Sequence, residues 1–297
     1  MNRFAFSFLT TFVIGAASFA QTQTSRVQFG ASNTDYALPN GGLYFAILGE
    51  DSTDDGSSVS GSFDGEWSGL NRSEEESTMY FSGYAAAQGY YGGMHTYATG
   101  SLTDSFYNSE NDPLMNSQTN EFNEFGVPDV VDIYAHAGWS DRLMVGSTAT
   151  NYYSTWIFDV SGLNTGEESF AYLTIRIGNN PAVPFYFGLG STNETLRVSQ
   201  YIVGGTEEDI TFNLYSFFQP STQYFDDGAY IEGSSNFGHT VTLEGIEFRD
   251  APGGSIIEGL DLTSASGYQY EAVPEPASMA ALGVGVLALL RKRRKSA

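Results

Sequence analysis

Cysteine is absent from this chain of 297 residues. Disulfides therefore contribute nothing to the fold, although the export pattern described below is the context in which they normally form. Stability has to come from buried apolar surface, backbone pairing or bound ions. About 250 residues remain when the two terminal segments are set aside, which is enough for a sizeable hydrophobic core in one all-β domain.

Positive charge is scarce and unevenly placed. The chain has 12 Lys and Arg against 35 Asp and Glu. Five of the cations lie at residues 291–295, and Arg3 is at the other end. Residues 21–273 keep six arginines, no lysine and 34 acids, a net charge of −28. Negative charge disfavours nucleic acid and anionic lipid as partners of this body, because like charges repel. Solubility, cations or neutral polymers such as polysaccharide suit it better.

Amphipathic helical patterns are also missing from the body. Aromatic residues make up 15% of the chain, glycine occurs 34 times, and charged residues are only 16%. Short segments rich in strand-forming residues recur between turn residues. They are LYFAIL (43–48), TWIFDV (155–160), FAYLTIRI (170–177), PFYFGLG (184–190), TLRVSQYIV (195–203) and DITFNLYSFF (209–218). Strands without intervening helices predict an all-β body, a β-sandwich or jelly roll.

One segment predicts an irregular strand. In HTVTLEGIEFRD, Val241 and Leu243 share one face, whereas Ile246 and Phe248 have the opposite parity. A strand with period two needs an extra residue to keep all four on the core side. We therefore expect a β-bulge near Glu244–Gly245, with two strands joined at Gly245 as the alternative.

Long polar stretches predict loops in the first half of the chain. Residues 50–65 (EDSTDDGSSVSGSFDG) and 104–126 are rich in turn residues. A domain boundary near residues 108–123 is one interpretation. We favour a single domain over residues 21–272, without internal repeats.

The first 20 residues resemble a secretory signal peptide. Arg3 precedes an apolar stretch at residues 4–17, and Ser18-Phe19-Ala20 has the small-x-small pattern of a cleavage site. We expect cleavage between Ala20 and Gln21 after passage through the Sec translocon. An uncleaved anchor is the alternative, but the polar residues 21–25 follow at once.

Calcium is the only cofactor that any motif suggests. DSTDDG places Asp51, Thr53, Asp55 and Gly56 at positions 1, 3, 5 and 6 of a calcium-loop spacing. The twelfth position is Ser62 instead of a bidentate Glu. Asp-Gly and Ser-Gly pairs also occur in turns for conformational reasons. We expect no cofactor and no metal, with Asp51 and Asp55 as the calcium candidates.

Catalytic motifs are weak, so we expect no enzyme activity. The histidines are His95, His136 and His239, and their spacing suits neither zinc nor a triad. GWSDR at 138–142 has Arg142 where a nucleophile elbow needs glycine. Asp132 and His136 lie near it. With 34 acids in the body, some carboxylate pair always fits a glycosidase, so that pattern carries no information.

Aromatic residues offer a binding interpretation. SGYAAAQGYYGGMHTY at 82–97 combines four tyrosines with glycine, and Trp67, Trp139 and Trp156 add large rings. Such rings stack on sugar faces, but they also fill sandwich cores and pair across strands. Packing is the favoured interpretation, and carbohydrate binding is the alternative.

The C-terminus carries a short apolar helix and a basic tail. Residues 279–290 would span about 18 Å as a helix, less than the roughly 30 Å of a hydrocarbon core. The cations at 291–295 would hold residues 291–297 in the cytoplasm by the positive-inside rule. We expect a short transmembrane helix with the body outside.

Residues 273–297 resemble the PEP-CTERM sorting domain of Gram-negative bacteria. Pro274-Glu275-Pro276, the apolar helix and RKRRK follow one another in the order of that family. The resemblance implies recognition by a membrane-embedded exosortase, with cleavage near Pro274-Glu275-Pro276. It also implies a setting of exopolysaccharide and biofilm matrix.

Together these features predict an exported, non-catalytic protein of the cell surface or matrix. It would be anchored transiently in the inner membrane through its C-terminal helix before processing. The alternatives are a carbohydrate-binding module for exopolysaccharide and a secreted glycan hydrolase.

Overall fold

The computed structural model describes residues 21–37, 43–70, 76–106, 130–146, 148, 150–166, 168–220 and 230–270. Thirteen β-strands make up the regular structure of these residues. They are β1 (Thr22–Ala37), β2 (Leu43–Thr53), β3 (Val59–Leu70), β4 (Glu76–Tyr90), β5 (Gly93–Phe106), β6 (Val130–Val145), β7 (Asn151–Thr165), β8 (Ser169–Ile177), β9 (Val183–Phe187), β10 (Gly190–Val203), β11 (Glu207–Phe218), β12 (Tyr230–Arg249) and β13 (Leu262–Ser264).

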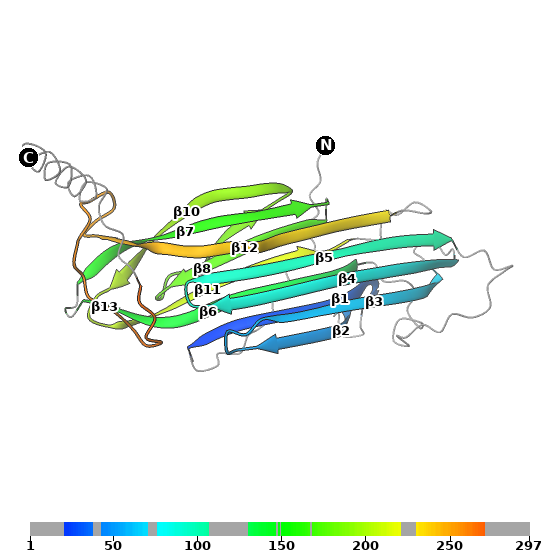
Figure 1. Ribbon diagram of the computed structural model, residues 1–297, viewed down its shortest axis with the longest axis horizontal. Helices are drawn as coiled ribbons and strands as arrows, with labels where there is room; N and C mark the ends of the chain where they lie inside the picture. The colour runs from blue at the N-terminus through cyan, green and yellow to red at the C-terminus, as the bar shows by residue number, and fades with distance from the viewer. Residues whose placement is uncertain are drawn as a thin grey trace, which may run out of the picture.

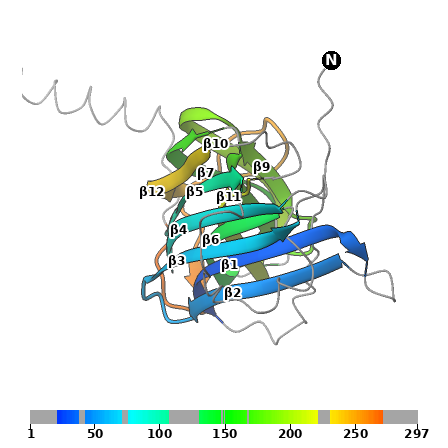
Figure 2. The same ribbon diagram turned by 90° about the vertical axis from the view of Figure 1, so that its right-hand side faces the viewer.

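Two antiparallel sheets pack together as a sandwich, which confirms the all-β prediction. Sheet A has the order β2-β1-β6-β11-β8-β9, and β13 also pairs with β6. Sheet B has the order β10-β7-β12-β5-β4-β3. Figure 1 looks onto sheet B, with β10 at the top and β3 near the bottom, and Figure 2 turns the molecule by 90°. Long strands give each sheet two extended faces, one toward the core and one outward.

The core follows the alternation of side chains along each strand. In β8, Leu173, Ile175 and Ile177 are fully buried, while Thr174 and Arg176 between them are only partly buried. At the centre, Phe212 of β11 lies 4.2 Å from Trp139 and 5.3 Å from Trp156, measured between ring centroids.

The predicted β-bulge lies in β12. Leu243 pairs with Phe158 and Gly245 pairs with Ile157, so Glu244 is the extra residue. Gly245 has φ of 155°, a conformation that glycine adopts readily. Val241, Ile246 and Phe248 are buried, and Leu243 packs against them at the margin of the core. One inserted residue therefore keeps all four apolar side chains on the inner face.

The predicted loop at residues 50–65 is wrong. β2 continues to Thr53 and β3 begins at Val59, so only a short turn separates them. In β3, Val59 and Phe63 face the core with Gly61 between them. An inward glycine hides the alternation that would have identified this strand. Of the second predicted loop, residues 104–106 belong to β5, and residues 107–129 lie outside the described residues.

A C-terminal strap, residues 262–270, crosses one end of the sandwich. Asp141 of β6 is 3% exposed and accepts hydrogen bonds from the hydroxyls of Ser264 (2.6 Å), Ser266 (2.6 Å) and Tyr270 (3.0 Å). Backbone N–H groups of Arg142 and Ser266 donate to its other carboxylate oxygen. The rings of Tyr268 and Tyr270 pack edge to face at 4.9 Å. Tyr270, 8% exposed, therefore anchors the strap in the core, and Leu262 and Tyr268 pack against it.

Several predictions fall outside the described residues. They are the signal peptide at 1–20 with its Ala20–Gln21 cleavage site, the residues Pro274, Glu275 and Pro276, the helix at 279–290 and the basic tail. No helix within the described ranges is long and apolar enough to cross a membrane. The single domain at 21–272 stays a prediction.

Candidate functional site: a tyrosine-lined groove

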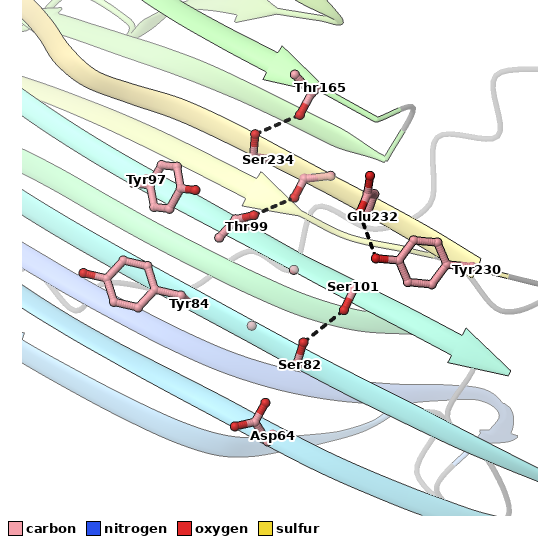
Figure 3. Close-up of a pocket in the computed structure, with 13 residues that line it drawn as sticks. Asp64, Ser82, Tyr84, Tyr97, Thr99, Ser101, Thr165, Tyr230, Glu232 and Ser234 are labelled. Carbon is pink, nitrogen blue, oxygen red and sulfur yellow. Dashed lines mark hydrogen bonds between the residues drawn. The ribbon is translucent and has the colours of Figure 1, made fainter.

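An open groove lies on the outer face of sheet B. Its volume is about 490 Å³, and Figure 3 shows it from the solvent side. Its lining comes from strands β3, β4, β5, β12 and β7. The lining residues are Asp64, Ser82, Gly83, Tyr84, Tyr97, Thr99, Gly100, Ser101, Thr165, Tyr230, Glu232, Gly233 and Ser234.

The floor of the groove is a row of three glycines. Gly83, Gly100 and Gly233 are direct neighbours on β4, β5 and β12. The position that a Cβ atom would take at each glycine points toward sheet A. A Cβ atom added to Gly83 would lie 2.1 Å from Ile133 Cδ1, and one added to Gly100 would lie 2.5 Å from the same atom. Side chains of sheet A therefore occupy the space that larger residues would need. Sheet B approaches sheet A closely here, and its outer surface carries the groove above this row.

The register of the strands sorts the outward residues into rows. Asp64, Ser82, Ser101 and Glu232 are successive neighbours across β3, β4, β5 and β12. We call these four residues the polar row. The flanking rows lie two residues away along each strand, about 6.8 Å on either side.

Tyrosines stand on both sides of the polar row. Tyr84 is 41% exposed and lies 5.9 Å from Tyr97 on one side, with the two rings inclined at 53°. On the other side Tyr230 is 58% exposed, and Tyr80 is beside the same row. Tyr84 and Tyr230 are therefore the exposed rings in the lining of the groove. They are the rigid amphipathic surface that sugars and other flat polar molecules contact.

Hydroxyl groups cover the space between the tyrosines. Figure 3 shows Ser82 bonded to Ser101 at 3.0 Å and Thr165 bonded to Ser234 at 2.8 Å. Thr99 donates to the carbonyl oxygen of Gly233 at 3.0 Å. A hydroxyl has one donor and two acceptor positions, so each pair retains capacity for a ligand.

The ionisable groups of the groove are acids and tyrosines. Asp64 and Glu232 end the polar row, and no Lys, Arg or His is among the lining residues. The Tyr230 hydroxyl donates to Glu232 Oε2 at 2.8 Å, and this bond raises the pKa of Tyr230. The groove therefore carries hydroxyls, exposed rings and negative charge, a combination suited to a polyhydroxylated ligand without negative charge of its own.

The calcium candidates lie elsewhere, with Asp51 near the end of β2 and Asp55 in the turn between β2 and β3. Asp55 Oδ1 accepts bonds from Thr53 Oγ1 at 2.6 Å and from the Ser57 N–H at 2.9 Å. Hydrogen bonds from Ser57 and Thr53 lower the pKa of Asp55 to about 2. Asp51 accepts from the backbone of Ser52. Within the described ranges no three acidic or histidine side chains form a group suited to a metal.

The histidine and serine near GWSDR have other partners. Ser140 shares a hydrogen bond with Thr22 at 2.8 Å. His136 Nε2–H donates to Asn213 Oδ1 at 3.0 Å, and burial lowers the pKa of His136 to about 4. His95 bonds to Tyr90 and to the carbonyl of Gly238. The side chain of His239 lies outside the described part of the chain.

The outer face of sheet A carries a second set of aromatic rings. Phe170, Phe217, Tyr172, Tyr215 and His136 form a continuous stack across β8, β11 and β6. Successive centroids lie 4.4–5.7 Å apart, with interplanar angles of 7–22°. These rings cover each other's faces, so the stack favours cross-strand packing over ligand contact. Aromatics at alternate positions, Phe170/Tyr172 and Tyr215/Phe217, were the signal for it in the sequence.

Two of the tryptophans pack in the core, whereas the 82–97 segment contributes residues to the groove. Trp139 and Trp156 are buried in the core, and the side chain of Trp67 lies outside the described residues. Residues 82–97 form most of the β4–β5 hairpin, which contributes Tyr84 and Tyr97 to the groove. Sequence reasoning missed Tyr230, Glu232 and Asp64, since only strand register brings them beside this hairpin.

Comparison with known proteins identifies the C-terminal segment. Residues 272–295 match the PEP-CTERM protein-sorting motif. A search among curated proteins finds no match. Two structures of infectious bursal disease virus, of the Gt and Gx strains, are 12% and 13% identical to the chain. They cover 92% and 89% of this chain and 73% of each viral chain, with TM-scores of 0.16 and 0.14.

The match confirms the resemblance at the C-terminus and concerns that segment alone. PEP-CTERM proteins are exported and associated with the membrane or cell surface, and the motif implies processing by exosortase. The chain therefore carries an exosortase sorting signal behind an all-β body.

Proposed function

We propose that the body is a non-catalytic polysaccharide-binding protein of the cell surface or matrix, sorted there through its C-terminal signal. One observation carries the binding function: exposed tyrosines flank a row of hydroxyls over a glycine floor. A chain of sugars lying along the polar row would place ring faces against Tyr84 and Tyr230. Its hydroxyls would meet Ser82 and Ser101.

The geometry favours binding over hydrolysis. Asp64 and Glu232 are three strand spacings apart in the same row, about 14 Å. Glycosidases hold their two carboxylates about 5–9.5 Å apart, close enough to act on one bond. Two acids at the ends of the row can contact separate sugar units instead.

Binding is tested with the exopolysaccharide of the producing bacterium. We expect the purified protein to be retarded in gels that contain the polymer, and Tyr84→Ala to lose most of that retardation. Tyr201→Ala is the matched control, because Tyr201 is also an exposed tyrosine of sheet B but lies on β10, outside the groove. Equal retardation of all three proteins would place binding elsewhere.

Sorting is tested separately from binding. Replacing Pro274, Glu275 and Pro276 with alanine should leave the protein unprocessed and reduce the amount at the cell surface. Immunoblots of membrane, surface and medium fractions measure both effects. Unchanged processing and location would rule out this segment as the sorting signal.

A further inference from the structure

We infer that the groove prefers a polysaccharide that carries free amino groups, such as a glucosamine polymer, over neutral and acidic chains. This inference rests on the proposed binding function and adds the chemical class of the ligand. It follows from the charges of the groove and from the positions of the arginines.

Negative charge stands at both ends of the polar row. Asp64 ends it on β3 and Glu232 ends it on β12, about 14 Å apart. Glu66 is on the same face of β3, two residues beyond Asp64. The distance between Asp64 and Glu232 exceeds the electrostatic screening length of about 8 Å at physiological salt, so each of these two carboxylates acts on its own sugar unit.

The arginines of the described residues do not compensate this charge. Arg26 pairs with Glu50 at 2.9 Å, and Arg142 pairs with Asp209 at 3.3 Å. Arg197 and Arg249 both contact Glu247, at 2.9 and 3.2 Å. Arg176 donates to Thr211 on the outer face of sheet A. None of the five lines the groove.

An ammonium group fits the acceptor positions that the hydrogen bonds within the row leave unused. It has three donors and no acceptor. Asp64 and Glu232 supply carboxylate oxygens, and Ser82 and Ser101 supply hydroxyl lone pairs between them. The exposed face of Tyr84 adds a cation–π contact. An acetylated amine loses both the charge and two of its donors, and a uronic acid would face two carboxylates of its own sign.

Binding is measured by calorimetry with the processed protein and three oligosaccharides of equal length. The probes are a β-1,4-linked glucosamine oligomer, its fully N-acetylated form and an oligogalacturonate. We expect the glucosamine oligomer to bind with the highest affinity and this affinity to fall as the salt concentration is raised. The galacturonate should bind weakest.

Isosteric variants separate charge from shape. Asp64→Asn and Glu232→Gln should each lower the affinity for the glucosamine oligomer by about 2- to 5-fold, as for the loss of an exposed ion pair. The affinity for the acetylated oligomer should stay unchanged. The double variant should bind both oligomers almost equally. Asp159→Asn is the matched control, an exposed acid on β7 in the same sheet but outside the groove.

The outcomes distinguish this inference from the proposed function. If both amino-sugar oligomers bind equally, lose affinity with Tyr84→Ala and ignore Asp64→Asn and Glu232→Gln, the glycan site stands and the amine preference is wrong. If polylysine competes as well as the glucosamine oligomer and Tyr84→Ala changes nothing, the effect is charge alone and the inference is overturned. If none of the glycans binds, the proposed function fails as well.

Discussion

The hydroxyl of Tyr270 donates a hydrogen bond of 3.0 Å to the carboxylate of Asp141, which lies 129 positions earlier in the chain. This bond ties the C-terminal strap to β6 on the inner side of sheet A. Only three residues separate Tyr270 from Pro274. The sorting segment therefore begins almost directly at a residue held in the core of the body.

Asp141→Ala should destabilise the protein by about 3 kcal/mol or more, because three hydroxyls and two backbone N–H groups lose their hydrogen-bond acceptor. Tyr270→Phe is the graded comparison, since it removes one bond, keeps the ring and should cost about 1–2 kcal/mol. Chemical denaturation measures both changes. Hydrogen exchange at residues 262–270 should rise most in Asp141→Ala. Protection equal to that of the unchanged protein would show that the strap holds without this carboxylate.

The contacts of the strap could not be predicted from the sequence. Strand-forming residues between turn residues predicted β8 and β11, and a parity shift predicted the bulge near Glu244–Gly245, because both signals are local in the sequence. Asp141 gave no such signal. Its partners come from a polar, glycine-containing segment more than 120 residues away, and only the fold brings them together.

The groove was hidden from the sequence for a related reason. Tyr84 and Tyr97 lie in a segment whose tyrosines and glycines suggest binding, but Tyr230 and Asp64 come from distant strands placed beside it by register. On β3 a different inward glycine, Gly61, interrupts the apolar alternation that would have identified the strand. Composition therefore predicted the class of fold, and pairing between strands determined the site.

Gly83→Ala and Gly100→Ala should each destabilise the sandwich, by about 1–3 kcal/mol, because the new methyl group meets Ile133. Shortening that side chain with Ile133→Val should recover part of the loss in a double variant. Gly188→Ala is the control, since nothing lies within 4 Å of the position of its new Cβ. Thermal and denaturant unfolding give the comparison. Purely additive effects in the double variant would mean that Ile133 does not limit the spacing of the sheets.

Deleting Glu244 should cost about 3–6 kcal/mol. Without the extra residue, either Val241 and Leu243 or Ile246 and Phe248 turn toward solvent, and two large side chains lose their burial. Glu244→Ala keeps the bulge and changes only an exposed side chain, so it should stay within about 0.5 kcal/mol. Equal unfolding midpoints for the deletion and Glu244→Ala would contradict the role of the bulge.

His136 and Asp132, both on β6, should give opposite pH dependences of stability. Burial lowers the pKa of His136 from 6.5 to about 4. Between these values the unfolded chain binds a proton that the folded chain does not, so His136 reduces stability as the pH falls from 6.5 toward 4. Burial raises the pKa of Asp132 to about 6, so the folded chain keeps a proton that the unfolded chain releases. Asp132 therefore reduces stability as the pH rises from about 4 to about 6.

Single variants separate these two contributions. His136→Phe keeps a ring on Tyr215 and cannot titrate, so it should gain about 1–2 kcal/mol relative to the unchanged protein between about pH 7 and pH 5. Asp132→Asn should show the reverse, with its advantage largest near neutral pH, where the buried carboxylate is ionised. Urea titrations at several pH values measure the difference for each variant. Parallel curves of stability against pH for His136→Phe and the unchanged protein would show that this histidine titrates as it does in water.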